Sequence, residues 1–150
     1  MKRATYDKPR CEFRAEASFG CVGYRVRRLS RVVSAIYDEA FAPLNLKISQ
    51  FGVLAMLGRR GPLTAADLCR LVVMDKSTAS RNLQRMRRRG WLSAVQGSLG
   101  PGQRVSLTRE GARVLQAAYP LWRKAQEEAS RRLGVDGLQA LDVVDARIKE

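Results

Sequence analysis

The sequence contains no histidine, and its three cysteines, Cys11, Cys21 and Cys69, are odd in number and follow no zinc-site spacing. These two absences argue against histidine-based catalysis and against a structural metal. The chain also lacks a glycine-rich phosphate loop, and its carboxylates are scattered. We therefore expect no enzymatic activity, no metal and no cofactor.

Long apolar segments are also missing. The chain has no run of 18 apolar residues, and its polar start, MKRATYDKPR, lacks the apolar core of a signal peptide. We therefore expect a cytoplasmic protein and no membrane partner. A length of 150 residues with 45% hydrophobic residues is enough for one globular domain with a real core.

Acidic residues are absent where basic ones gather. The formal charge is +14, and residues 76–109 hold eight Lys or Arg and no Asp or Glu. More than half of the net charge thus lies in less than a quarter of the chain. Such a charge implies a polyanionic partner, either nucleic acid or an anionic membrane surface, and a localised basic face indicates binding.

Hydrophobic periodicity predicts a mainly α fold that follows a flexible arm at residues 1–19. A seam with helical spacing, ended by Pro43, consists of Val22, Val26, Leu29, Val33, Ile36 and Ala40. Ser49 should cap a compact, buried helix over Gln50–Leu57. Thr64 should begin a short third helix, and residues 72–74 should form the turn that follows it.

The next stretch, MDKSTASRNLQRMRRRGWL at residues 74–92, predicts a helix capped by Asp75 or Ser77 and ended by Gly90. Ala79, Leu83 and Met86 share its apolar face. The opposite face holds Ser77, Arg81, Gln84, Arg85 and Arg88, flanked by Thr78 and Ser80. Arginine can grip guanine or phosphate with two hydrogen bonds, and small hydroxyls allow close approach. The alternative is a solvent-exposed face that is merely basic.

Two short alternating segments, residues 91–95 and 104–107, predict a β-hairpin with a loose, glycine-rich tip. Thr108 should cap a long helix kinked at Pro120 and ended by Gly134, and Leu138, Leu141, Val144 and Ile148 mark a last helix. A short helix, a tight turn, a basic helix and a hairpin have the order of a winged helix-turn-helix. Its second helix enters the major groove of DNA.

The runs ISQFGVLAMLGRRGPLTAADLCRLVVMDKSTASRNLQRMRRRGWL and RVSLTREGARVL resemble the MarR (multiple-antibiotic-resistance-regulator) family of bacterial transcription factors. The resemblance spans roughly residues 22–133. It implies a homodimer with residues 20–43 and 109–150 as the helical dimerisation domain and residues 44–108 as the winged helix-turn-helix lobe. It also implies an effector site between domain and lobe.

The family's wing usually carries Asp-x-Arg, and this chain has Leu99-Gly100-Pro101 there, which leaves Arg104 as the wing cation. The residues expected to bind double-stranded DNA are Thr64, Lys76, Ser77, Thr78, Ser80, Arg81, Gln84, Arg85, Arg88 and Arg104. The residues expected at the dimer interface are Val22, Val26, Leu29, Val33, Leu115, Trp122, Leu138 and Leu141.

Candidate sensing residues lie on the helices assigned to the dimer. Cys21 lies near the position of the reactive cysteine in the organic-hydroperoxide regulators of the family, and Arg25 could favour its thiolate. Cys11 could serve as the resolving cysteine that pairs with an oxidised Cys21, or both thiols could be incidental. Cys69 is expected to fill the core. Tyr24, Tyr37, Tyr119 and Trp122 either line a pocket for an aromatic or amphipathic effector or form plain interface packing.

These observations together predict a homodimeric, sequence-specific DNA-binding regulator, a repressor more than an activator, that acts on an inverted-repeat operator. Release by a small molecule or an oxidant is part of that hypothesis. Two alternatives remain at this point. One is an RNA-binding winged-helix module, and the other is an architectural protein that coats DNA without sequence preference.

Overall fold

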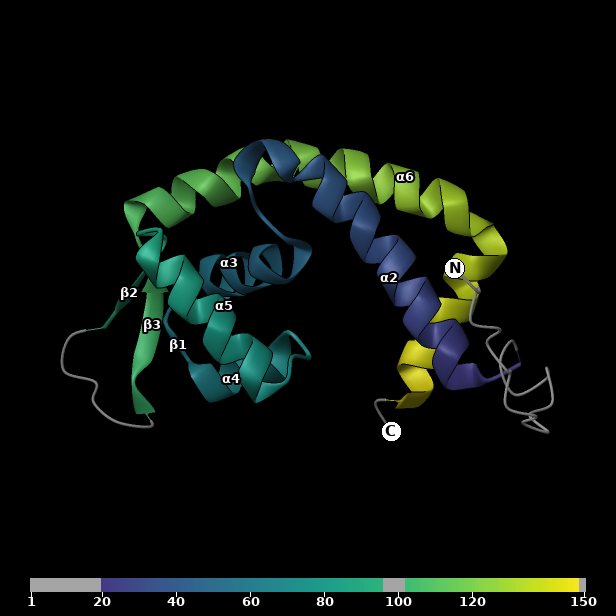
Figure 1. Cartoon of the computed structure of the whole chain (residues 1–150), viewed down its shortest axis with the longest axis horizontal. Coiled ribbons are helices and arrows are strands. Elements are labelled where there is room, and N and C mark those ends of the chain that lie inside the picture. The colour runs from purple at the N-terminus through teal and green to yellow at the C-terminus, as the bar shows by residue number, and fades with distance from the viewer. Residues whose placement is uncertain (1–19, 96–101, 149–150) are drawn as a thin grey trace, which may run out of the picture. The chain divides into compact units, whose positions relative to one another are not determined.

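The structure is a computed structural model that describes residues 20–95 and 102–148. The elements are α2 (Val22–Ala40), the 3-10 turn η1 (Ala42–Leu44), α3 (Ile48–Arg60), β1 (Leu63–Thr64), α4 (Ala65–Leu71), α5 (Lys76–Arg88), β2 (Leu92–Ala94), β3 (Arg104–Leu107) and α6 (Arg109–Ile148) (Figure 1). The predicted class, mainly α with a small β wing, is confirmed. The arm at 1–19 and the wing tip at 96–101 lie outside the described residues.

The chain divides into two compact units between Val33 and Ser34. The first described unit is the N-terminal part of α2, whose seam residues Val22, Val26 and Leu29 are exposed. The second unit contains the end of α2 and every later element. Within the described residues, no helix combines the length and apolar character that a membrane span needs.

The start of α3 corrects a prediction. Ser49 lies inside α3 and does not cap it, because the helix begins one residue earlier, at Ile48. The N–H of Ile48 donates instead to Asp38 Oδ1 at 2.8 Å, and the N–H of Lys47 donates to Gln50 Oε1 at 3.1 Å. Asp38, ten residues upstream on α2, thus accepts the hydrogen bond at the start of α3 in the capping role that was expected of Ser49.

The sheet has a third strand that local periodicity did not reveal. Its order is β1-β3-β2, all antiparallel, with Leu63 opposite Val105 and Leu92 opposite Leu107. A strand of two residues is too short to show alternation, so only its long-range partner identifies β1. The hairpin of β2 and β3 is confirmed.

The break in α6 lies at Gly134 (φ 69°, ψ 173°), as expected for the boundary with the last helix. Pro120 lies inside α6, and the non-helical backbone angles occur at Gly134 and not at the proline. Thr108 caps the helix as predicted, because its Oγ1 accepts from the N–H of Gly111 at 3.0 Å. The same hydroxyl donates to the carbonyl of Gly90 at 2.6 Å and so ties α6 to the end of α5.

The core of the second unit lies between α3, α5, the sheet and the first half of α6. Its largest fully buried side chains are Phe41, Leu46, Leu54, Leu68, Met86 and Val105. A row of aromatic rings continues from it: Phe41 stacks on Phe51 with 5.0 Å between centroids, and Phe51 stacks on Trp122 at 6.4 Å. These contacts give α5 a rigid base on which to present its outer face.

Candidate nucleic-acid interface

Helix α5 is held at both ends by contacts that the sequence predicts. Asp75 caps it, because Oδ1 accepts from the N–H of Thr78 at 2.8 Å. The bonds from Thr78, followed by the nearby Arg81 charge, lower the pKa of Asp75. Gly90 follows the C-terminal end with φ 71°, a conformation that favours glycine. The cap and the stop of α5 are confirmed.

The inner face of α5 fixes its rotation about its own axis. Ala79, Leu83 and Met86 are buried, as predicted. Asn82, which the sequence analysis missed, is also buried, and its Nδ2 donates to Ser49 Oγ at 3.2 Å and lies 3.6 Å from Met74 Sδ. The signal for Asn82 was its angular position beside Met86 on the helical projection. A rotated α5 would leave this amide buried without a partner, at a cost of about 1–3 kcal/mol.

The outer face of α5 consists of exposed side chains, as predicted. The exposed residues are Lys76, Ser77, Ser80, Arg81, Gln84, Arg85, Arg87 and Arg88, whereas Thr78 is half-buried. Within residues 20–95 and 102–148, none of the ion pairs involves a cation of α5. This face therefore presents positive charge that the protein itself does not neutralise.

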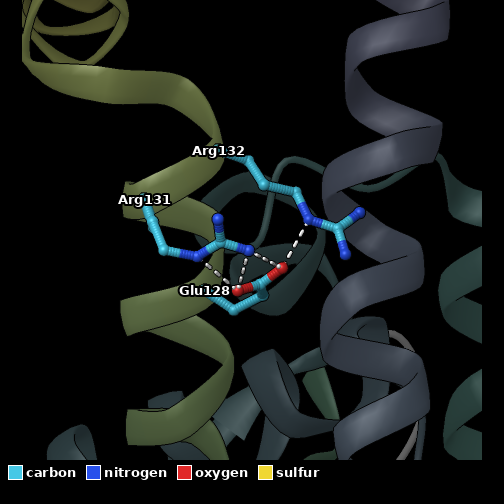
Figure 2. A network of polar contacts seen from close by, with 3 residues as sticks. All are labelled: Glu128, Arg131 and Arg132. Carbon is cyan, nitrogen blue, oxygen red and sulfur yellow. Dashed lines mark hydrogen bonds and ion pairs between the residues drawn. The ribbon is translucent and has the colours of Figure 1, made fainter.

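Some cations elsewhere on the chain are paired with carboxylates. On α6, Arg131 Nη2 lies 2.8 Å from Glu128 Oε2 and Arg132 Nε lies 2.5 Å from Oε1, so one carboxylate serves two arginines (Figure 2). These bonds lower the pKa of Glu128. A solvated basic face normally carries such internal pairing. Its absence from α5 favours binding over a merely solvated surface.

A groove of about 660 Å³ runs between α4, α5 and β3. Its floor is apolar, and its rim is polar or cationic through Lys76, Ser80, Gln84, Arg87 and Gln103. The sequence analysis missed Arg87 and Gln103. On a helical projection Arg87 falls on the same side of α5 as Lys76 and Ser80, and this alignment could have identified it as part of the groove. Arg85 and Arg88 line a different hollow, at the start of α3.

Thr64 has a structural task that limits its role at DNA. Its Oγ1 accepts from the N–H of Asp67 at 3.1 Å and donates to Asp67 Oδ2 at 2.8 Å. Since the hydroxyl has one proton, a bond to a phosphate would require the bond to Asp67 to break. These bonds, with Arg70 and Arg104 nearby, lower the pKa of Asp67. Arg104 is exposed on β3, opposite Thr64.

The residues predicted for the dimer interface fall into two groups. Val22, Val26, Leu29 and Leu141 are exposed, and Val33 and Leu138 are half-buried. Leu115 and Trp122 instead pack on α3 of the same chain: Leu115 Cδ2 fills the space beside Gly58, and Trp122 stacks on Phe51. Both side chains are half-buried in the single chain, and their place at a dimer interface stays a prediction.

The candidate sensing residues are dispersed. Tyr37 is buried, burial raises the pKa of its hydroxyl, and that hydroxyl donates to Gln126 Oε1 at 2.5 Å. Tyr24 and Cys21 are exposed, and Cys11 lies outside the described residues. Cys69 is half-buried and lines the groove between α4 and α5, so it is not the core residue expected. The effector site stays a prediction.

We expect Cys21 to be incidental. The Cys21→Ser variant should bind DNA like the wild type and respond to peroxide in the same way, because the position at the start of α2 suits an ordinary small residue. Band-shift titrations with and without peroxide and reductant check this. Peroxide release of the wild type alone, reversed by a reductant, would establish Cys21 as a sensor.

Comparisons with known proteins agree with this geometry. A model of the MarR family matches residues 44–98. The transcriptional regulator MosR of M. tuberculosis is 31% identical, with a TM-score of 0.74 over 86% of this chain and 94% of that one. A structure of MosR in complex with DNA is 32% identical, with a TM-score of 0.72 over 84% and 92%. The uncharacterised HTH-type transcriptional regulator YwoH of Bacillus subtilis is 25% identical over 105 residues, 70% of this chain and 77% of that one.

Proposed function

The chain belongs to the MarR family of DNA-binding transcription regulators, and we propose that it is a homodimeric repressor that reads an inverted-repeat operator through α5. One observation carries the proposal: α5 presents an outer face of arginines and small hydroxyls that forms no ion pair with any residue the structure describes. The similar regulator MosR has been crystallised with DNA, which supports duplex DNA as the partner.

The N-terminal half of α5 is the part suited to the base edges. Ser77 and Ser80 are small and exposed, so the backbone can approach the floor of the major groove. Arg81 lies between them and the later arginines, where its guanidinium can bond a guanine with two hydrogen bonds. Lys76 suits phosphate, because its exposed ammonium carries positive charge at the start of the helix, whereas the Asp75 cap already occupies the N–H of Thr78.

The groove beside α5 extends this surface towards the wing. Lys76, Gln84 and Arg87 come from α5, and Gln103 precedes β3. We expect a DNA backbone to follow this cationic rim while Arg81 contacts bases. Arg104, the first residue of β3, follows Gln103 and lies opposite Thr64 of β1. In this proposal, phosphate contacts along the rim fix the position of the protein on the duplex. The base contacts of Arg81 give the sequence preference.

Arg81→Ala tests the assignment of α5. The variant should lose about 1–3 kcal/mol of operator affinity and should relax base preference, since a two-bond contact to a base is removed. Lys76→Ala should weaken operator and random duplex similarly. Fluorescence anisotropy with operator, random duplex and structured RNA at one salt concentration measures both effects.

Arg123→Ala is the matched control, because Arg123 is an exposed arginine on α6. It should bind operator like the wild type. Unchanged affinity and selectivity in Arg81→Ala would contradict the recognition-helix assignment. Equal wild-type affinity for operator and random duplex would indicate an architectural protein instead, and preference for RNA would indicate an RNA-binding module.

A further inference from the structure

A second cationic hollow, of about 370 Å³, lies between the start of α3 and the C-terminal half of α5. It is lined by Asn45, Lys47, Gln50, Arg85, Arg88 and Arg89. Four of these six residues are cations, and none is a carboxylate. We propose that this hollow binds a phosphate group, on the side of α5 away from the groove of Arg87.

Two of the four cations are held in place by the protein. Lys47 Nζ lies 3.2 Å from Asp38 Oδ2. Arg89 Nη1 donates to the carbonyl of Asn45 at 2.6 Å, and its guanidinium lies 4.1 Å from the centroid of Trp91. Side chains fixed before binding lose little entropy when a ligand arrives. Arg89 is thus a preorganised cation with neutral partners, and Lys47 is a positioned donor whose charge Asp38 partly offsets.

The other two cations, Arg85 and Arg88, are exposed, and no described contact occupies their guanidinium groups. Among the described residues, Asp38 forms its ion pair with Lys47, and no carboxylate forms one with Arg85 or Arg88. Arginines that hold a phosphate through two parallel bonds are the strong form of such contacts. The hollow offers donors and positive charge, which fits an oxyanion.

Arginine in the last turn of a helix also stabilises the helix dipole. That effect accounts for Arg85 and Arg88 as isolated residues of α5. It does not account for Lys47, which comes from the start of α3, or for the orientation of Arg89 towards Asn45. The convergence of two elements on one hollow distinguishes a binding site from dipole stabilisation.

This proposal deepens the proposed function, on which it rests. The phosphate has two possible sources: the backbone of duplex flanking the operator core, or a free phosphate in solution. A free phosphate would hold Arg85 and Arg88 against α3 and would compete with DNA for them. A duplex phosphate would instead anchor the C-terminal end of α5.

The first arm uses the DNA-free full chain. Inorganic phosphate should raise the midpoint of thermal unfolding above that in sodium chloride of equal ionic strength. Lys47→Gln and Arg88→Gln should remove this increment, because each removes one cation of the hollow. Lys124→Gln, which changes an exposed lysine on α6, is the matched control and should retain it.

The second arm measures binding to operator duplexes of increasing flank length in chloride buffer. If the phosphate comes from DNA, Lys47→Gln should weaken binding by a factor of about 10–100 on the long duplex, as for a charged hydrogen bond, and less on the short one. Lys124→Gln should behave like the wild type. Arg88 is exposed and forms no described ion pair, so Arg88→Gln should fold normally. This second variant separates a loss of phosphate binding from a folding defect in Lys47→Gln.

An effect in either arm supports the phosphate site and identifies its source. If Lys47→Gln and Arg88→Gln match Lys124→Gln in both arms, the hollow does not bind phosphate and the proposal is overturned. A wild type that fails to bind any duplex but gives the first-arm increment would contradict the proposed function and leave the phosphate site intact.

Discussion

Raising the salt concentration from about 50 to about 200 mM should weaken operator binding by a factor of about 10³–10⁵, the largest effect expected for this protein. The reason is the release of counterions from each phosphate that a cation neutralises. Helix α5 alone carries Lys76, Arg81, Arg85, Arg87 and Arg88, none of them in a described ion pair. Two copies in a dimer could reach about 6–10 phosphates.

The slope of log affinity against log salt is the measurement. Arg87→Gln should reduce its magnitude by about 1–2, since a dimer loses two contacts of about 0.9 each. Arg123→Gln, on α6, should leave the slope unchanged. A nearly flat titration of the wild type would argue against DNA as the partner, and equal slopes for both variants would exclude Arg87 from the interface.

The sequence was sufficient wherever structure follows from near neighbours. The cap at Asp75, the stop at Gly90 and the buried side of α5 depend on residues within one or two turns, so a helical projection predicts them. The exposed arginines follow from the same projection. The class of the fold and the order of its elements could therefore be predicted before any long-range contact was known.

The missed features all depend on partners distant in the chain. Asp38 caps α3 from α2, β1 exists only through β3, and Asn82 is buried against Ser49. The apolar spacing of Leu115 and Trp122 fits a dimer seam and a lobe core equally well. The structure adds the packing of α6 on α3, in which both residues contact α3 of the same chain and stay half-buried.

Other apolar residues are more exposed than Leu115 and Trp122 and are the clearer candidates for a dimer interface. On α2, Val22 is 71% exposed and Val26 58%, and Leu29 is 38% exposed. Beyond Gly134, the exposed apolar residues of α6 are Val135, Leu141, Val143, Val144 and Ile148. Single exposed apolar residues are ordinary, but several of them on each of two helical segments are unusual for a monomer in water. We propose that a second copy of the chain covers them.

Leu29→Glu should therefore disrupt the dimer and operator binding together. The carboxylate would be buried in the interface without a partner, which typically costs about 3–5 kcal/mol, so dimer affinity should fall by at least about 100-fold. Ala35→Glu is the matched control, because Ala35 is exposed on another side of α2 and the charge change is equal. Light scattering and operator titrations at one protein concentration measure both losses.

Dimerisation and operator binding should be lost together because the proposed dimer is symmetric. A two-fold axis would place the two copies of α5 about one turn of duplex apart, roughly 34–36 Å, so that half-site centres lie about 10 base pairs apart. A monomer would engage one half-site and forfeit the gain from the second. Inserting five base pairs between half-sites should likewise weaken wild-type binding, because it turns one half-site to the opposite side of the duplex. A Leu29→Glu monomer that binds the whole operator with wild-type affinity would rule out this architecture.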